Sequence, residues 1–198
     1  MSPIQPDALD VFLAHLDQRR SLPAKQLGLP GPNEPTLMRM LASAVRVPDH
    51  GKRVPFRFIR ISGDSGHALG DALVARTREL NPDAGDTALD KDRKRFTHAP
   101  LVIVVVARLG EDTKIPVQER LLTTGCVCFA LLQAAQAAGF GAQWLTGWPA
   151  YDTHVHTLLG MNADEAVAGF IHIGTASIEA PERDRPDAAE LLSDWTPA

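Results

Sequence analysis

Hydrophobic residues spaced three or four positions apart recur along much of the chain. In residues 7–18, the apolar side chains from Leu9 to Leu16 keep this spacing, which places them on one face of a helix. The same kind of pattern predicts a second helix over residues 36–46. Further helices are predicted over residues 64–80, 86–96, 118–138 and 153–159.

Strands are predicted where β-branched and aromatic residues cluster between turn residues. The run "LVIVVVA" at residues 101–107 is continuously apolar, which is typical of a strand covered on both faces. Other strands are predicted over residues 56–62, 142–145 and 166–176. Helices and strands interleave without a repeating βαβ series. We therefore expect one α+β domain over residues 1–198, with a single sheet flanked by helices on both faces.

The predicted helix at residues 118–138 has almost no charge in its middle, "TTGCVCFALLQAAQAA". A helix that is apolar all round must be buried all round. In a chain this short, a subunit interface is the expected place to bury it. The polar, proline-containing tail after residue 176 is expected to lie mostly outside the core.

Composition narrows the class of protein. The chain has 198 residues, of which 44% are hydrophobic and 22% charged, as in ordinary soluble domains. A net charge of −4 gives no reason to expect nucleic acid or an anionic membrane as partner. Cys126 and Cys128 would point about 200° apart on a helix, so neither a mutual disulfide nor a shared metal is expected. With no signal-peptide pattern, these features predict a cytoplasmic protein.

Several common catalytic signatures are absent from the sequence. There is no G-x-G-x-x-G after a predicted strand and no G-x-x-x-x-G-K-[ST], which argues against a Rossmann dinucleotide site and a nucleoside triphosphatase. His154 and His156 would face apart on a helix, so we expect no metal there. His172 alternates within an apolar strand, which is typical of a core or interface residue.

Arg19, Arg20 and Ser21 follow the first predicted helix and precede Pro23. Two interpretations are open for the arginines. Cations at a helix C-terminus complement its dipole, which contributes up to about 1 kcal/mol. Alternatively, guanidinium groups can hold a phosphate through paired charge-assisted hydrogen bonds.

An ordered set of segments adds to this picture: "RRS", "PDH", "APLVIVVVA", "KIPVQERLLTTGC", "WLTGW", "GFIHIGT" and "ERDRP". Together they resemble the FMN-dependent nitroreductase superfamily, in particular its short, YdjA-like NAD(P)H nitroreductases, over residues 7–195. The resemblance implies the nitroreductase-like fold, with a central mixed or antiparallel sheet. It also implies an intertwined homodimer that holds one FMN at each of two interface sites.

The resemblance also implies a set of cofactor contacts. Those for the FMN phosphate and ribityl chain are Arg19, Arg20 and Ser21, completed by Arg183 and Arg185. His50 would reach the flavin from the other subunit, and the segment Leu145, Thr146 and Gly147 would run along its ring. A solvated tail is the alternative for Arg183 and Arg185, and a plain strand-end turn is the alternative for Gly147. Trp144 and Trp148 would line the pocket or belong to the core.

One position departs from the family pattern. Close relatives commonly carry glutamine four residues after the histidine of "PDH", where this chain has Val54. Valine cannot donate the hydrogen bond that an amide would give. Arg53 is a possible substitute donor.

The implied activity is ping-pong transfer of a hydride from NAD(P)H, through N5 of FMN, to a nitroaromatic, quinone or similar acceptor. The flavin carries this chemistry, so no side chain is assigned as an obligatory acid or base. Two alternatives stay open: a specialised flavin enzyme of the same superfamily, and a flavin-binding protein without turnover, which Val54 would favour.

Overall fold

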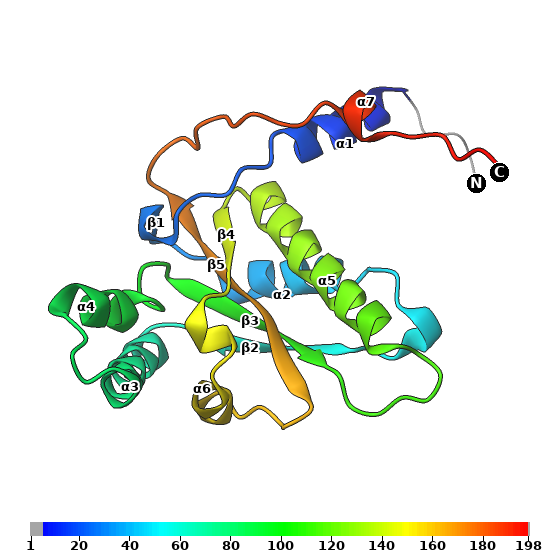
Figure 1. The fold of residues 1–198 in the computed structure, drawn as a ribbon. Helices are drawn as coiled ribbons and strands as arrows, with labels where there is room; N and C mark the ends of the chain where they lie inside the picture. The colour runs from blue at the N-terminus through cyan, green and yellow to red at the C-terminus, as the bar shows by residue number, and fades with distance from the viewer. Residues whose placement is uncertain (1–5, 198) are drawn as a thin grey trace.

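Five strands form one antiparallel sheet at the centre of the molecule (Figure 1). The computed structural model describes residues 6–197. Strands β2 (Phe56–Ile61), β3 (Leu101–Arg108) and β5 (Glu165–Ala176) lie side by side, and both β4 (Gly141–Leu145) and the short β1 (Leu27–Gly28) pair with β5. The expected α+β sheet is confirmed, and all of its strand pairs are antiparallel.

Strand β3 divides the core between the two faces of the sheet. Leu101, Ile103 and Val105 belong to one hydrophobic cluster, whereas Val102, Val104 and Val106 belong to the other. Every residue of the run from Val102 to Ala107 is at most 1% exposed. The prediction that this β-branched strand is covered on both faces is therefore confirmed.

Different helices cover the two faces. Helices α2 (Glu34–Ala44) and α5 (Val117–Ala137) pack on one face through residues such as Met40 and Leu131. The opposite face is covered by α3 (Asp64–Leu80), α6 (Thr153–Leu158) and Phe96, which follows α4 (Asp86–Lys94). The order of elements thus follows the predicted sequence of helices and strands closely.

Helix α2 begins earlier than predicted, at Glu34 instead of Thr36. Asn33 is its N-cap, and its side chain accepts a hydrogen bond from the backbone N–H of Thr36 at 3.0 Å. Pro35 fits the first turn because the N–H that it lacks would have no partner inside the helix. The helix therefore gains two residues that the apolar spacing did not include.

Helix α5 buries only one of its sides within a single chain. Val127, Cys128 and Leu131 are fully buried, whereas Leu122 is 62% and Phe129 46% exposed. The expected burial all round is therefore not provided by one copy of the chain. The two cysteines do face apart, as predicted, because Cys126 is exposed and Cys128 is buried.

Both ends of the chain lie outside the sheet. Helix α1 (Pro6–Asp17) leads into η1 (Ala24–Gln26), and the tail after β5 runs back past the end of α1 before the short α7 (Ala188–Leu191) (Figure 1). The tail residues are mostly exposed, as expected. Two further 3-10 turns, η2 (His50–Lys52) and η3 (Trp148–Ala150), carry segments that matter below.

Candidate functional site

The residues after α1 are held beside the start of β4. The backbone N–H of Leu22 donates to the carbonyl of Ala142 at 3.3 Å, and that of Ala24 donates to Oε1 of Gln143 at 2.6 Å. The helix has ended at Asp17, and Pro23, which has no N–H to donate, keeps the following segment out of a helix while it runs beside the strand. Arg19, Arg20 and Ser21 therefore lie at one end of β4.

The C-terminal tail brings two more arginines to the same place. Arg20 pairs with Glu182, whose other carboxylate oxygen lies 3.9 Å from Nη2 of Arg185. A cavity of about 510 Å³ is lined by Leu16, Asp17, Arg19, Arg20, Glu182, Arg183 and Arg185. Its lining carries four guanidinium groups and two carboxylates, so its charge is positive.

The pKa of Arg19 shows the effect of this crowding. It lies below its ordinary value, first because the side chain is partly buried, and then because Arg185, Arg20 and Arg183 repel its charge. Nη1 of Arg19 also donates to Oγ of Ser21 at 3.2 Å. An anion bound here would relieve the repulsion, so the cluster fits a phosphate.

The two arginines of "RRS" differ in their contacts. Nη1 of Arg20 donates to the backbone carbonyls of Asp17 and Arg19, the latter at 3.1 Å, and so caps the end of α1. Arg19 makes its hydrogen bond with Ser21 instead. The helix-capping interpretation therefore describes Arg20, and the anion interpretation describes Arg19 better.

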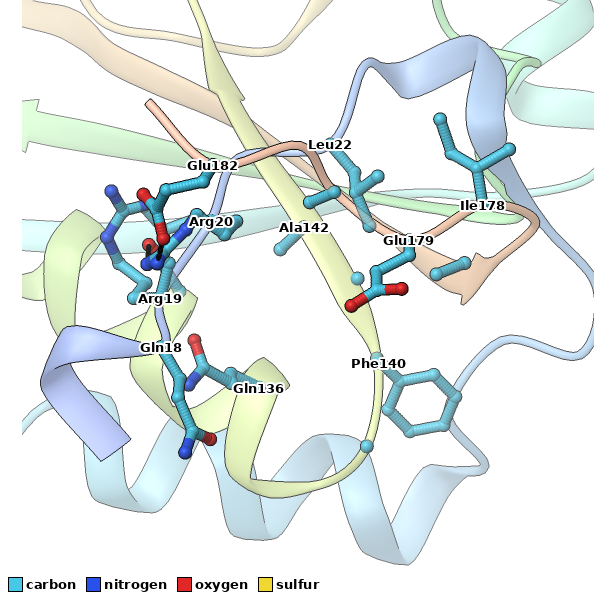
Figure 2. A pocket seen from close by; sticks show the side chains of 15 residues that line it. Gln18, Arg19, Arg20, Leu22, Gln136, Phe140, Ala142, Ile178, Glu179 and Glu182 are labelled. Atoms are coloured by element: carbon cyan, nitrogen blue, oxygen red, sulfur yellow. Dashed lines mark hydrogen bonds and ion pairs between the residues drawn. The ribbon is translucent and has the colours of Figure 1, made fainter. Parts of the chain in front are cut away.

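A second cavity, of about 630 Å³, extends from these arginines across the start of β4 toward Phe140 and Ile178 (Figure 2). Arg19, Arg20 and Glu182 gather at one end of the view, and Ala142 and Phe140 lie along the strand. Its lining includes the small residues Gly141 and Ala142 at the start of the strand. Space for a ligand is thus continuous with the positive cluster.

The predicted ring-contact segment lies at the other end of the same strand. Gly147 has φ 80° and ψ −177°, a combination that only glycine adopts readily. From Gly141 to Leu145, β4 covers about 13 Å at roughly 3.3 Å per residue. One strand therefore separates the positive cluster from the turn at Leu145, Thr146 and Gly147.

Both tryptophans beside this turn are anchored by their indole N–H groups. Trp144 donates to the carbonyl of Ala168 at 3.0 Å and packs against Gly169. Trp148 donates to Oδ1 of Asp92 at 3.0 Å and packs against the core cluster on the α3 side. Of the two interpretations, a structural role fits Trp148 well.

Sequence reasoning missed the residues that surround Trp148. Asp92 is only 5% exposed, and its carboxylate also accepts from Thr77 at 2.7 Å and from Nη2 of Arg95 at 3.1 Å. Asp92 and Arg95 stand three positions apart on one helix face, a spacing that favours an ion pair. That spacing was a usable signal, although it could not reveal the contact with Trp148.

His50 lies apart from the arginines within one chain. Its Nδ1 is 2.6 Å from Oε2 of Glu119, in the first turn of α5. The cavity of about 630 Å³ that begins at Arg19 and Arg20 instead touches Gln136, near the other end of α5. Seventeen residues of helix separate Glu119 from Gln136, which is about 25 Å. One chain does not bring His50 to the predicted phosphate site.

The loop after His50 has an unusual backbone. Lys52 and Val54 adopt φ angles of 51° and 47°, which are rare for residues other than glycine. The Asp49 carboxylate accepts from the backbone N–H groups of Arg53 and Val54, at 3.0 and 2.8 Å. Nε of Arg53 donates to Asp112 at 2.6 Å, which leaves Arg53 poorly placed to replace the missing glutamine.

Residues 6–197 contain neither a membrane-spanning helix nor a cluster of metal-binding side chains. In that range, no helix is both long and apolar enough to cross a membrane. Likewise, within the described residues no group of three or more histidine, cysteine, aspartate or glutamate side chains could hold a metal ion.

The chain is similar to known nitroreductases in sequence and in fold. Residues 16–175 match the model described as "Nitroreductase family". The Escherichia coli (strain K12) protein named "Putative NAD(P)H nitroreductase YdjA" is 32% identical over 174 residues, which are 88% of this chain and 91% of YdjA.

Solved structures share the fold at lower identity. A nitroreductase-like family protein from Bacillus cereus has a TM-score of 0.78 at 19% identity and covers 98% of both chains. A Desulfovibrio desulfuricans protein, solved as "a putative nitroreductase in complex with fmn", has a TM-score of 0.72 at 20% identity, over 98% of this chain and 100% of the other. The chain belongs to the nitroreductase family, whose members are oxidoreductases.

Proposed function

We propose that this protein is an FMN-dependent NAD(P)H oxidoreductase that reduces nitroaromatic, quinone or similar small acceptors. The observation that carries the proposal is the excess of positive charge around Arg19, at one end of β4, with the glycine turn at Gly147 at the other. An elongated ligand with a phosphate at one end and a flat ring at the other suits this arrangement. FMN has that form.

Each predicted contact has a distinct task in this proposal. Arg19, Ser21, Arg183 and Arg185 hold the phosphate, while Arg20 caps α1 and helps to position Glu182. The Leu145–Gly147 segment presents its backbone to the ring. At Gly147, the absence of a side chain lets a planar ligand come close. The FMN bound to the Desulfovibrio relative and the NAD(P)H in the name of YdjA support the choice of cofactor and of electron donor.

When bound, FMN supplies the redox chemistry, exchanging a hydride with the nicotinamide and then with the acceptor at N5. The protein contributes binding, orientation and exclusion of competing reactions. Since donor and acceptor take turns at one site, the reaction follows a ping-pong scheme and needs no separate dinucleotide fold. No side chain of this site has to move a proton for hydride transfer itself.

A homodimer completes the proposed site. Leu122, Cys126 and Phe129 form an exposed apolar stripe on α5, at helical spacing. A two-fold axis passing Cys126 would place Glu119 opposite Gln133 of the partner subunit, because such interfaces are self-complementary. It would carry His50, which contacts Glu119, to the arginine end of the other copy. Two identical sites would then lie between the subunits.

The test is the visible spectrum of the purified protein before and after anaerobic addition of NADPH. Flavin bands that bleach would support the proposal. A bound flavin that NADPH and NADH leave oxidised would instead favour the flavin-binding protein without turnover, which the Val54 departure suggests. Absence of any flavin after reconstitution with FMN would overturn the proposal.

A matched pair of double variants tests the phosphate assignment. Arg19→Ala with Ser21→Ala should strip FMN from a protein that stays folded. The control is Arg39→Ala with Ser43→Ala, which removes another arginine–serine hydrogen bond. In this pair, Nη1 of Arg39 donates to Oγ of Ser43 at 2.7 Å on the surface of α2, outside the positive cluster. FMN content, measured by absorbance after desalting, should fall only in the first variant; equal retention in both would sink the assignment.

A further inference from the structure

Arg95 lies against the turn to which the proposed function assigns the flavin ring. A β-carbon built on Gly147 would come within 3.1 Å of Nη1 of Arg95, so the guanidinium touches the backbone at this position. The Arg95 side chain is only 14% exposed. A nearly buried positive charge therefore stands directly behind the segment Leu145–Gly147.

Asp92 fixes the orientation of that guanidinium. Its Oδ1 accepts from Nη2 of Arg95 and from the indole of Trp148, and its Oδ2 accepts from Thr77. Trp148 directly follows Gly147 in the chain, so one carboxylate ties α3, α4 and the turn together. With all three donors in place, Arg95 has little freedom to rotate away from Gly147.

The guanidinium is not fully used by this network. Nη2 binds Asp92, but Nε is buried and, among the residues that the structure describes, has no hydrogen-bond partner. An unpaired buried donor is costly and calls for an explanation. The carboxylate of Asp92 accepts from Thr77 and from the indole of Trp148, whereas Nη1 of Arg95 is the atom nearest to a β-carbon built on Gly147. At Gly147 itself, the guanidinium is therefore the charged group in contact.

We propose that Arg95, held by Asp92, is a positioning residue of the flavin site whose charge favours the reduced cofactor. The inference rests on the proposed function, since it concerns the same site. Arg95 acts through the Gly147 backbone, which it supports from behind, and through its field. Reduction adds electron density to a flavin ring, so a fixed positive charge beside the ring stabilises the reduced form more than the oxidised one.

The experiment compares the midpoint potential of bound FMN in the holoenzyme and in three variants. Arg95→Met with Asp92→Asn removes both charges and so leaves no buried carboxylate without its ion-pair partner. Arg95→Lys keeps the charge. The matched control is Arg93→Met with Asp71→Asn, which removes another ion pair between α4 and α3, 3.5 Å long and exposed.

In the first double variant, we expect the preference for reduced over oxidised FMN to be about tenfold smaller than in the wild-type protein. For two electrons, this corresponds to a midpoint potential about 30 mV below the wild-type value. Arg95→Lys and the Arg93 control should keep the wild-type potential. A loss of flavin affinity that is equal in both redox states would reveal a purely structural role and overturn the inference.

The outcomes separate the inference from the function on which it rests. If the Arg95→Met, Asp92→Asn variant binds FMN with the wild-type midpoint potential, the charge of Arg95 does not affect the ring, and only the inference fails. If the wild-type chain binds no FMN, both fail together. If the midpoint potential falls in the Arg95→Met, Asp92→Asn variant but stays at the wild-type value in Arg95→Lys and in the Arg93 control, Arg95 is part of the site.

Discussion

At the scale of single residues, Gly147 is the position where backbone conformation and packing act together. Its φ of 80° disfavours any side chain, and a β-carbon there would stand only 3.1 Å from Nη1 of Arg95, which would have to shift slightly. Gly139 has nearly the same φ, 82°, but nothing lies within 4 Å of its virtual β-carbon. The two glycines therefore separate backbone strain from crowding.

Gly147→Ala should cost more stability than Gly139→Ala. The control variant carries backbone strain alone, about 1–2 kcal/mol. The Gly147 variant adds the displacement of Arg95 to a strain of about 1–3 kcal/mol, and should also weaken FMN binding. Urea unfolding of the two variants measures the difference. Equal losses would mean that Arg95 moves aside freely.

Val54 is a β-branched residue in the left-handed region, where valine is an outlier. Val54→Gly should relieve this strain, and the gain of about 1–3 kcal/mol should exceed the entropic cost of glycine, about 0.5–1 kcal/mol. Val45→Gly is the control, because Val45 is similarly exposed but has an ordinary φ of −78°. Thermal unfolding should show the first variant stabilised and the second destabilised; a loss in both would show that Val54 is unstrained.

At the scale of elements, local patterns predicted what local interactions determine. The apolar spacing of α1 and the β-branched run of β3 have periods that a sequence shows directly. The two-residue strand β1 was missed because it exists only through its pairing with Thr175 and Ala176, about 150 positions away. The contact of Arg95 with Gly147 is equally non-local, so no motif contains it.

The candidate site shows the same division. The resemblance pointed to Arg19 and Arg183, but only the fold shows that the tail brings them to one cavity. The different tasks of Arg19 and Arg20 were also hidden, because neighbouring residues after a helix point in different directions. The motif "PDH" pointed to His50 as a cofactor contact, but the sequence could not show that it lies far from Arg19 within one chain.

Strand β5 carries a histidine that should make stability depend on pH. His172 is 1% exposed, and burial, with smaller contributions from His98 and Arg95, lowers its pKa to about 4. Its Nδ1 has no partner among the described residues, and its ring stacks on Phe96. The folded protein therefore holds it neutral above about pH 4, and its burial agrees with the sequence-based expectation of a core or interface residue.

The sign follows from proton uptake. Between about pH 6.5 and pH 4, the unfolded chain binds a proton at His172 that the folded chain excludes, so stability falls as pH falls, by about 3 kcal/mol in total. His172→Phe should flatten the stability profile across this window. Glu165, whose pKa Arg57 lowers to about 2, loses its contribution mostly below this window, as pH falls from about 4.5 toward 2. A variant with the wild-type slope between pH 6.5 and pH 4 would exclude His172 as the cause.

At the scale of the whole molecule, the exposed stripe of α5 links assembly to cofactor binding. Leu122 is 62% exposed in one copy of the chain, beside Cys126 and Phe129. In the proposed dimer these side chains are buried between the subunits, where an unpaired charge would be costly. The same interface would carry His50 to the arginine end of the partner's site.

Leu122→Glu should therefore produce a folded monomer that binds FMN poorly, although the substitution lies outside the arginine cluster. Leu80→Glu is the matched control, because Leu80 is a similarly exposed leucine, 58%, at the end of α3 and away from the stripe. Light scattering gives the mass and absorbance the flavin content of each variant, and circular dichroism reports folding. A monomeric variant with full FMN occupancy would show that one chain holds the cofactor alone, and a dimeric one would place the interface elsewhere. A monomeric mass together with a loss of FMN, in the Leu122 variant only, would show that dimerisation and cofactor binding both depend on this face of α5.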